Sequence, residues 1–425
     1  MTSKRRSRDD EGAGESEFQA MSKPAMAQEN PLGASALLPF DVIKDILSRL
    51  PVQSLVRFES VSKPFLSLIK SPDFVAAHLA RSARKPAILL RRFHNPTGSN
   101  FAVSFLDLRT SRIHDIRIPF IGSLIRFPKI VGSCSGLLCL DISPCYATDF
   151  ALWNVATGSF RSLPRPRLLD NHVPFWMVSA GFGCETVTDD FYIVRIVAYG
   201  PCSNPDSQNQ GTTRVEVFSL KNDSWKILDG SLTEPVFASC AINEGQLGVA
   251  VRGSIYWVAN GVGKSFNKKF VICYDMINAE FRSIALPDLI GDVCVKIMEL
   301  KESLALTLYP SLPIHPLLAG RGPSYRVELW VLDECSNDGK HWVKLHTFQC
   351  PIGLASGCPV GIWNNYELIL KRQEGQCLTL SVMDPRTHGV KKLAISPADF
   401  SCDVYWYVES LLPVHVFPHH QSAQG

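Results

Sequence analysis

The chain has 425 residues and a formal net charge of +3, with 46% hydrophobic and 20% charged residues. This composition is typical of a folded globular protein, and the small net charge argues against a broad nucleic-acid-binding surface. No stretch reaches the ~18 continuous apolar residues of a membrane span, and no secretion signal is visible. The 13 cysteines include no Cys-x-x-Cys pair. We therefore expect free thiols in a reducing compartment and a cytoplasmic or nuclear location.

The N-terminal region changes character between a polar tail and a helical segment. Residues 1–34 are charged, small and polar, which predicts a disordered tail. Apolar residues then follow a helical period from Asp41, with Pro39 suited to the helix start and Pro51 to its end. Further short helices are predicted around Leu55 and around Leu66, and Ser71-Pro72 has the sequence of an N-cap that opens a fourth helix. The helical region as a whole is expected at 37–82.

From about Lys85 onward, short β-rich runs bounded by Gly, Pro, Asn and Asp replace the helical patterns. One unit recurs, in which an apolar strand, a polar turn and a second strand follow one another. It occupies 104–119, 151–164, 215–228, 271–287, 327–348 and 380–395. The recurrences start about 47 to 64 residues apart with other strand pairs between them, as four-stranded propeller blades would. They predict six blades within residues 86–415, followed by a loose tail at 416–425.

The helical region resembles an F-box, the motif that docks onto the Skp-type adaptor of cullin–RING ubiquitin ligases. The resemblance spans residues 38–79 and rests on Leu-Pro at 38–39, Arg-Leu-Pro at 49–51 and Arg-Phe at 57–58. Ser62 and Phe65 stand where the family usually has Cys and Trp, and the smaller ring is expected to weaken docking modestly. The resemblance implies that ten residues make the adaptor contact or the packing that shapes it: Leu38, Pro39, Ile43, Ile46, Leu47, Leu50, Pro51, Leu55, Phe58 and Phe65. The alternative is a plain helical subdomain packed on the β domain.

The rest of the chain is similar to the F-box-associated domain of the large plant F-box families, which is often described as kelch-like. Matching stretches include Gly132–Cys139, Leu152–Asn154 with Thr157-Gly158, and Tyr407–Leu411. The implied fold class is α + all-β, a three-helix F-box with a following helix and then a kelch-like β-propeller of six blades. The implied function is that of a non-catalytic substrate receptor in a Skp–cullin–F-box ubiquitin ligase. Its partners would be a Skp-type adaptor, the cullin and RING subunits reached through it, and a target protein.

Several motifs partly resemble catalytic or ligand-binding motifs, but the residues around them do not fit those functions. Gly261–Ser265 lacks the first glycine of a phosphate-binding loop, since Val258 stands there, and a strand follows it. Gly132-x-Cys134-x-Gly136 has the spacing of a nucleophile elbow, but the next residues predict a strand and therefore a tight turn. The histidines have no metal-ligand spacing. We predict no catalytic residue, metal or cofactor.

Function is expected in loops, with aromatic residues packed between blades. Six tryptophans recur at blade-like positions and are predicted to pack there rather than to form a ligand cage: Trp153, Trp225, Trp257, Trp330, Trp342 and Trp363. The candidate target-binding loops are 200–213, 261–269, 310–324 and 334–341. Two alternatives to a ligase receptor remain. One is an adaptor-bound scaffold outside any ligase, and the other is a propeller enzyme, which would need convergent acids, a metal cluster or repeated Asp boxes.

Overall fold

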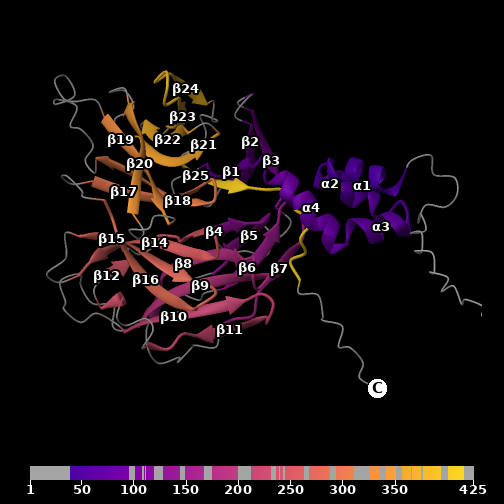
Figure 1. The fold of residues 1–425 in the computed structure, drawn as a ribbon, viewed down its shortest axis with the longest axis horizontal. Helices are drawn as coiled ribbons and strands as arrows, with labels where there is room; N and C mark the ends of the chain where they lie inside the picture. The colour runs from indigo at the N-terminus through magenta and orange to yellow at the C-terminus, as the bar shows by residue number, and fades with distance from the viewer. Residues whose placement is uncertain are drawn as a thin grey trace, which may run out of the picture.

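A computed structural model describes residues 39–415 (Figure 1), apart from 95–100, 108–109, 111, 119–127, 144–148, 167–174, 200–211, 231–235, 239, 243–244, 263–267, 288–292, 311–324, 335–340, 351–356, 365, 375–376 and 394–400. The two predicted tails and Leu38 lie outside the described residues. Four helices form a module at one side of a six-bladed β-propeller, which confirms the predicted architecture. No helix within the described ranges is long and apolar enough to cross a membrane.

The helical module contains α1 (Phe40–Ser48), α2 (Val52–Phe58), α3 (Lys63–Ile69) and α4 (Pro72–Ser82). Two serines cap its later helices. The Oγ of Ser62 accepts a hydrogen bond from the backbone N–H of Phe65, and that of Ser71 accepts one from Phe74, both at 3.3 Å. A proline in the first turn of each helix removes one N–H group that would have no partner within the helix. The predicted cap at Ser71 is confirmed, and Ser62 performs the same role for α3.

The strands form six sheets, numbered here as blades in chain order. Blade 1 contains β1 (Ala87–Phe93), β2 (Phe101–Asp107), β3 (Arg112–Ile116) and β25 (Ser401–Tyr407), and blade 2 contains β4 (Lys129–Cys134), β5 (Leu137–Asp141), β6 (Phe150–Asn154) and β7 (Phe160–Ser162). Blade 3 contains β8 (Phe175–Glu185), β9 (Asp190–Tyr199), β10 (Thr212–Ser219) and β11 (Ser224–Ile227). Blade 4 contains β12 (Cys240–Ile242), β13 (Val249–Val251), β14 (Ser254–Gly261), β15 (Lys269–Asp275) and β16 (Glu280–Ala285). Blade 5 contains β17 (Val293–Leu300), β18 (Ser303–Pro310), β19 (Tyr325–Asp333) and β20 (His341–Cys350), and blade 6 contains β21 (Cys358–Trp363), β22 (Glu367–Glu374), β23 (Cys377–Met383) and β24 (Val390–Leu393).

The C-terminal strand closes the propeller. β25 pairs antiparallel with β1 and forms the first strand of blade 1, so the two ends of the domain share one sheet. The innermost strands contact one another around the ring, from β25 to β4, β8, β13, β17 and β21 and back to β25. The packing of the inner strands around one ring protects their sheet edges, which is how propellers avoid unwanted strand pairing.

The recurrent unit seen in the sequence is the outer hairpin of each blade. In several blades an Asp or Asn at the end of the third strand accepts backbone N–H bonds from the next residues. Asp275 accepts bonds from the N–H groups of Ile277 and Asn278, and Asp384 accepts them from the two residues Arg386 and Thr387. Such a side chain starts a tight turn by substituting for a backbone acceptor. The polar residues between paired apolar strands therefore fix the hairpin positions.

The apolar core lies between adjacent blades. Six hydrophobic clusters each join two neighbouring sheets, and a seventh fills the helical module. All six tryptophans singled out in the sequence lie in or against these inter-blade clusters: Trp153, Trp225, Trp257, Trp330, Trp342 and Trp363. Aromatic side chains provide the large area needed to fill the wedge between twisted sheets. The predicted packing role of these tryptophans is confirmed.

The two faces of the propeller differ in the connections that they carry. β1 is the second strand of blade 1 and follows directly after α4. The module therefore lies at the face where second strands begin and first strands end (Figure 1). Short turns between the first and second strands lie at this face. The connections 200–211, 262–268 and 311–324 start and end at strand termini of the opposite face, while 334–340 starts and ends on the module side. Three of the four predicted binding loops therefore connect strand ends that lie at the face away from the helices.

Candidate functional site

The predicted adaptor-binding residues separate into a buried and an exposed group. Leu47 and Leu55 are buried in the core of the helical module with Leu68, Ile69 and Phe74. Against this core pack four partly buried residues of the predicted set, Ile43, Leu50, Phe58 and Phe65. Phe58 and Phe65 lie with ring centroids 6.0 Å apart. These six residues shape the module.

A second group of apolar residues is exposed on the same module. Ile46 is 46% exposed, and Pro39 and Pro51 are also exposed. Val42, Val56 and Val61 join them, so that four of the nine exposed large hydrophobic side chains in the described residues lie here. Sequence reasoning did not assign the three valines to the site. Helical spacing could have indicated Val42, because it lies one turn before Ile46 on α1.

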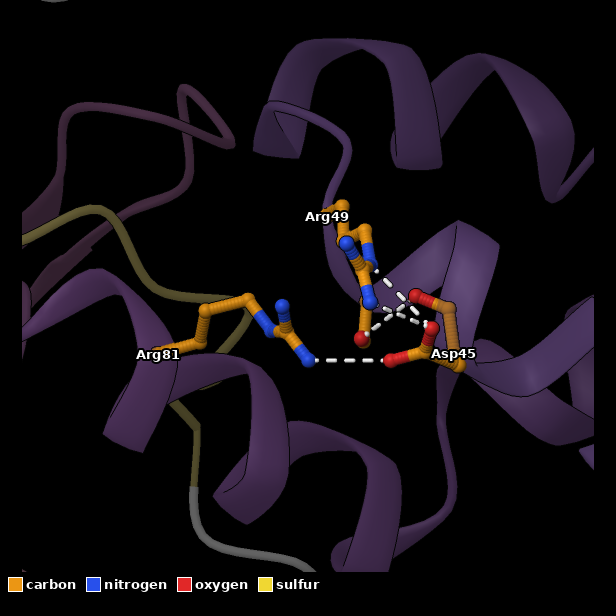
Figure 2. Close-up of polar contacts among 4 residues, drawn as sticks. Asp45, Arg49 and Arg81 are labelled. Carbon is orange, nitrogen blue, oxygen red and sulfur yellow. Dashed lines mark hydrogen bonds and ion pairs between the residues drawn. The ribbon is translucent and has the colours of Figure 1, made fainter. Parts of the chain in front are cut away.

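Asp45 of α1 forms ion pairs with Arg49 at the end of the same helix and with Arg81 of α4 (Figure 2). Arg49 donates through Nη2 to Oδ2 of Asp45 at 2.7 Å, and Arg81 of α4 donates to Oδ1 at 3.0 Å. The hydrogen bond from Arg49 keeps the pKa of the Asp45 carboxyl below its usual value. A buried link lies nearby, since Nε2 of His78 lies 2.9 Å from the backbone oxygen of Leu50. Asp45 is thus paired at the surface of the module, and the apolar side chains of Val42 and Ile46 on the same helix are also exposed.

The segment 408–414, here called the C-terminal clamp, joins the module to the propeller. Leu411 packs against the core of the helical module, whereas Leu412 and Val414 pack in the cluster between blades 2 and 3. Oε2 of Glu409 accepts a hydrogen bond from the backbone N–H of Val52 at 3.3 Å. Because Pro51 has no side chain that can cap α2, Glu409 caps that helix from a distant part of the chain.

Blade 2 holds the C-terminal clamp through two of the stretches recognised in the sequence. Nδ2 of Asn154 donates to the backbone oxygens of Ser410 and Leu412, at 2.9 and 2.8 Å. Gly136 abuts the clamp so closely that a Cβ placed on it would lie 2.2 Å from the Cβ of Ser410. The backbone of Gly136 has a φ of +83°, which favours glycine independently of that contact. Three stretches far apart in the sequence thus meet at one joint.

Comparison with known proteins identifies the family. The F-box domain family matches residues 36–76, and the F-box associated beta propeller domain family matches residues 115–414, which is most of the chain. The chain is an F-box protein with an F-box-associated propeller.

Similar F-box proteins are known from Arabidopsis thaliana. F-box protein CPR1 is 27% identical over 76% of this chain and 75% of its own length. An F-box/kelch-repeat protein is 26% identical over 71% of this chain and 73% of its own length. Among solved structures, TolB from Acinetobacter baumannii is 12% identical, with a TM-score of 0.44 over 79% of this chain and 73% of that chain. A structural likeness this low supports no functional argument.

The central channel of the propeller contains a cavity of about 650 Å3. Several of the charged side chains that line it contact other parts of the protein. Nη2 of Arg91 lies 2.5 Å from Oδ2 of Asp403, and Nζ of Lys129 donates to the backbone oxygen of Gly245 at 2.7 Å. Burial disfavours the charged ammonium and lowers the pKa of Lys129. The Arg91–Asp403 contact lies within blade 1, whereas the Lys129 contact links blade 2 to the segment that precedes β13 of blade 4.

The two motifs that resemble a nucleophile elbow and a phosphate-binding loop lie in connections between antiparallel strands. Ser135 and Gly136 form a tight turn between β4 and β5, as the sequence predicts for the Cys134 motif. β14 and β15 pair antiparallel on either side of the Gly261 motif, whose residues 263–267 lie outside the described part. In the described ranges no group of three or more His, Cys, Asp or Glu side chains is placed to hold a metal ion.

Proposed function

We propose that this F-box protein is the substrate-recognition subunit of a Skp–cullin–F-box ubiquitin ligase. The observation that carries the proposal is the concentration of exposed apolar residues on α1, α2 and the turn after α2. Ile46 and Val61 are 46% and 61% exposed, although the module is too small to leave such area uncovered without cost. The family match supports a Skp-type adaptor as the partner that covers this surface.

The division of the propeller into two faces supports a role in presenting a target. The F-box occupies the face with short turns, and the connections 200–211, 262–268 and 311–324 leave the sheets on the other face. Loops on a rigid scaffold are the usual place for recognition. In this proposal the C-terminal clamp holds the F-box in a defined position on the propeller. Ubiquitin transfer then follows from proximity, because the cullin and RING subunits bring a charged conjugating enzyme near target lysines.

Co-purification tests the proposal with a matched pair of variants. The full chain is expressed with a Skp adaptor and a cullin, alongside Ile46→Asp and the control Ile277→Asp. Both isoleucines are about half exposed, at 46% and 52%, but Ile277 lies in a hairpin turn of blade 4. Placing a carboxylate at a desolvated interface is expected to lower recovery of the adaptor at least ~tenfold for Ile46→Asp. Ile277→Asp is expected to retain it. A Leu47 variant is less suitable, because Leu47 is 5% exposed and its replacement tests folding instead.

The possible results separate the functions. Recovery of both adaptor and cullin with the wild type, and of neither with Ile46→Asp, supports a ligase receptor. Recovery of the adaptor without cullin would favour an F-box scaffold outside a ligase. Equal adaptor recovery by Ile46→Asp and wild type would reject this surface as the docking site.

A further inference from the structure

Two cysteines of neighbouring blades lie with their sulfur atoms in contact. Cys134 ends β4 of blade 2 and Cys184 is near the end of β8 of blade 3, both on innermost strands of the ring. Their Sγ atoms are 2.7 Å apart, and both residues are partly exposed. A disulfide bond needs a sulfur separation of ~2.05 Å, so a small displacement would join them.

This pair differs from the other described cysteines. Cys139, Cys240, Cys273, Cys350 and Cys402 are buried, whereas Cys294 and Cys358 are partly exposed like the pair. The partly exposed Cys358 instead has the hydroxyl of Tyr309 3.3 Å from its Sγ. Thiol oxidation requires both access and a nearby second thiol. Cys134 and Cys184 combine the two.

The surroundings shift the pKa values of the two thiols in opposite directions. The hydrogen bond that the Cys134 thiol donates lowers the pKa of Cys184 to about 7, against the raising effect of burial. That same hydrogen bond, together with burial, raises the pKa of Cys134 well above its usual value. The Oγ of Ser135 lies 3.6 Å from the sulfur of Cys184 and further stabilises its thiolate. A thiolate beside a protonated thiol is the arrangement of an attacking and a resolving cysteine.

We propose that Cys134 and Cys184 form a thiol-oxidation site that hydroperoxides convert into a reversible disulfide between blades 2 and 3. The thiolate of Cys184 attacks one peroxide oxygen, the O–O bond breaks, and with hydrogen peroxide the departing hydroxide takes from solvent the equivalent of the proton that Cys184 released, and leaves as water. The sulfur of Cys134 then attacks the sulfenic sulfur of Cys184, the S–O bond breaks, and the hydroxyl departs as a second water with the proton of Cys134. Two thiols lose two electrons and two protons, and the peroxide is reduced to two waters. In a reducing compartment such a bond is transient.

The position of this site connects it with the joint to the F-box. The turn that follows Cys134 consists of Ser135 and Gly136, and Gly136 abuts Ser410 of the C-terminal clamp. A bond from Cys134 to Cys184 fixes this turn against blade 3. It is expected to slow amide exchange in β4 and β8, because sub-global opening of that seam then requires breaking a covalent bond.

The test uses the full-length chain, reduced, freed of reductant and treated with a small molar excess of hydrogen peroxide. Loss of two free thiols is expected, together with a cross-link between tryptic peptides 130–161 and 168–195 that dithiothreitol reverses. The first peptide also contains Cys139 and Cys145, so fragmentation must place the bond on Cys134. Absence of the cross-link in the wild type, or its placement on Cys139 or Cys145, would overturn the proposal without reference to any variant.

Three serine variants test which cysteine attacks the peroxide and which one resolves the sulfenic acid. Cys134→Ser removes the resolving thiol, so a sulfenic-acid probe should label Cys184 roughly tenfold more than in wild type. Cys184→Ser should abolish both the cross-link and the labelling of Cys134. Cys358→Ser is the control, since it removes a partly exposed thiol outside the pair and should leave the cross-link unchanged. Unchanged thiol loss in Cys184→Ser would contradict the proposal.

Discussion

The side-chain amide of Asn154 donates hydrogen bonds to the backbone oxygens of Ser410 and Leu412, and 256 residues separate Asn154 from Ser410. Its Oδ1 also accepts bonds from the backbone N–H groups of Ala156 and Thr157. One side chain therefore shapes the outer hairpin of blade 2 and holds the C-terminal clamp. Since Leu411 of that segment packs in the F-box core, Asn154 is a central element of the joint between the two domains.

Replacing Asn154 with Ala is expected to destabilise the joint. Asn154 is buried, and its loss leaves the carbonyls of Ser410 and Leu412 without their amide donor. We expect a loss of about 2–3 kcal/mol in unfolding free energy, measured by urea denaturation. Asn222→Ala is the control, because Asn222 is exposed in a hairpin turn and should change stability by less than ~0.5 kcal/mol. Equal effects of the two variants would contradict the role of Asn154.

Gly136 and Gly158 provide a matched test of close packing. Their φ angles are +83° and +74°, so alanine is strained at both by a similar ~1 kcal/mol. A Cβ at Gly158 would meet nothing within 4 Å, whereas one at Gly136 would meet Ser410 at 2.2 Å. Because its new Cβ overpacks the site, we expect Gly136→Ala to lower the free energy of unfolding by ~1–3 kcal/mol more than Gly158→Ala does. Its thermal midpoint should therefore be clearly lower. Similar midpoints would show that the C-terminal clamp can move away.

Blade 3 contains a buried ion pair whose partners depend on each other. Arg195 and Glu216 face each other across β9 and β10, and both side chains are 1% exposed. Glu216→Leu leaves the guanidinium buried without its carboxylate and should cost about 3–5 kcal/mol in chemical denaturation. The double variant Arg195→Met with Glu216→Leu should recover most of that loss. For comparison, Lys344→Met breaks an ion pair whose lysine is 41% exposed, and should cost less than ~1 kcal/mol.

The Ser62 cap offers a local test within the F-box. Ser62→Ala removes the acceptor of the Phe65 N–H, which should weaken α3 by about 1 kcal/mol. Native-state hydrogen exchange at the Phe65 amide should then accelerate about fivefold. Ser67→Ala is the matched change at an exposed position inside the same helix, and it should leave that exchange unchanged or slower. Unaltered exchange in Ser62→Ala would show that the cap contributes little.

Local patterns in the sequence were sufficient to predict the helices, the outer hairpins and the number of blades. Ser71-Pro72 marks the start of α4 because a capping hydroxyl and a proline act within one turn of helix. Asp275 and Asp384 mark outer hairpins for the same reason, since each organises the next three residues. Six such hairpins imply six blades, because each blade repeats the same local chemistry.

Sequence reasoning was less successful for the surface of the F-box. Leu47 and Ile46 are adjacent aliphatic residues in one matched motif, yet one is buried and the other is 46% exposed. Their difference depends on the direction in which α1 presents each side chain to α4 and to the core. Periodicity predicts which positions of a helix are apolar. It does not predict which of them stay exposed when the apolar face of the helix is wider than the area that packs in the core.

The sequence by itself determined the two domains, the helices, the hairpins and the family, because these depend on contacts between residues close in the chain and on recognisable motifs. Only the tertiary structure decided how the ring closes through β25, where the C-terminal clamp lies and that Cys134 meets Cys184. Each of these pairs residues that are 50 or more positions apart. Such contacts are set by the packing of whole sheets around the channel, which no local pattern encodes.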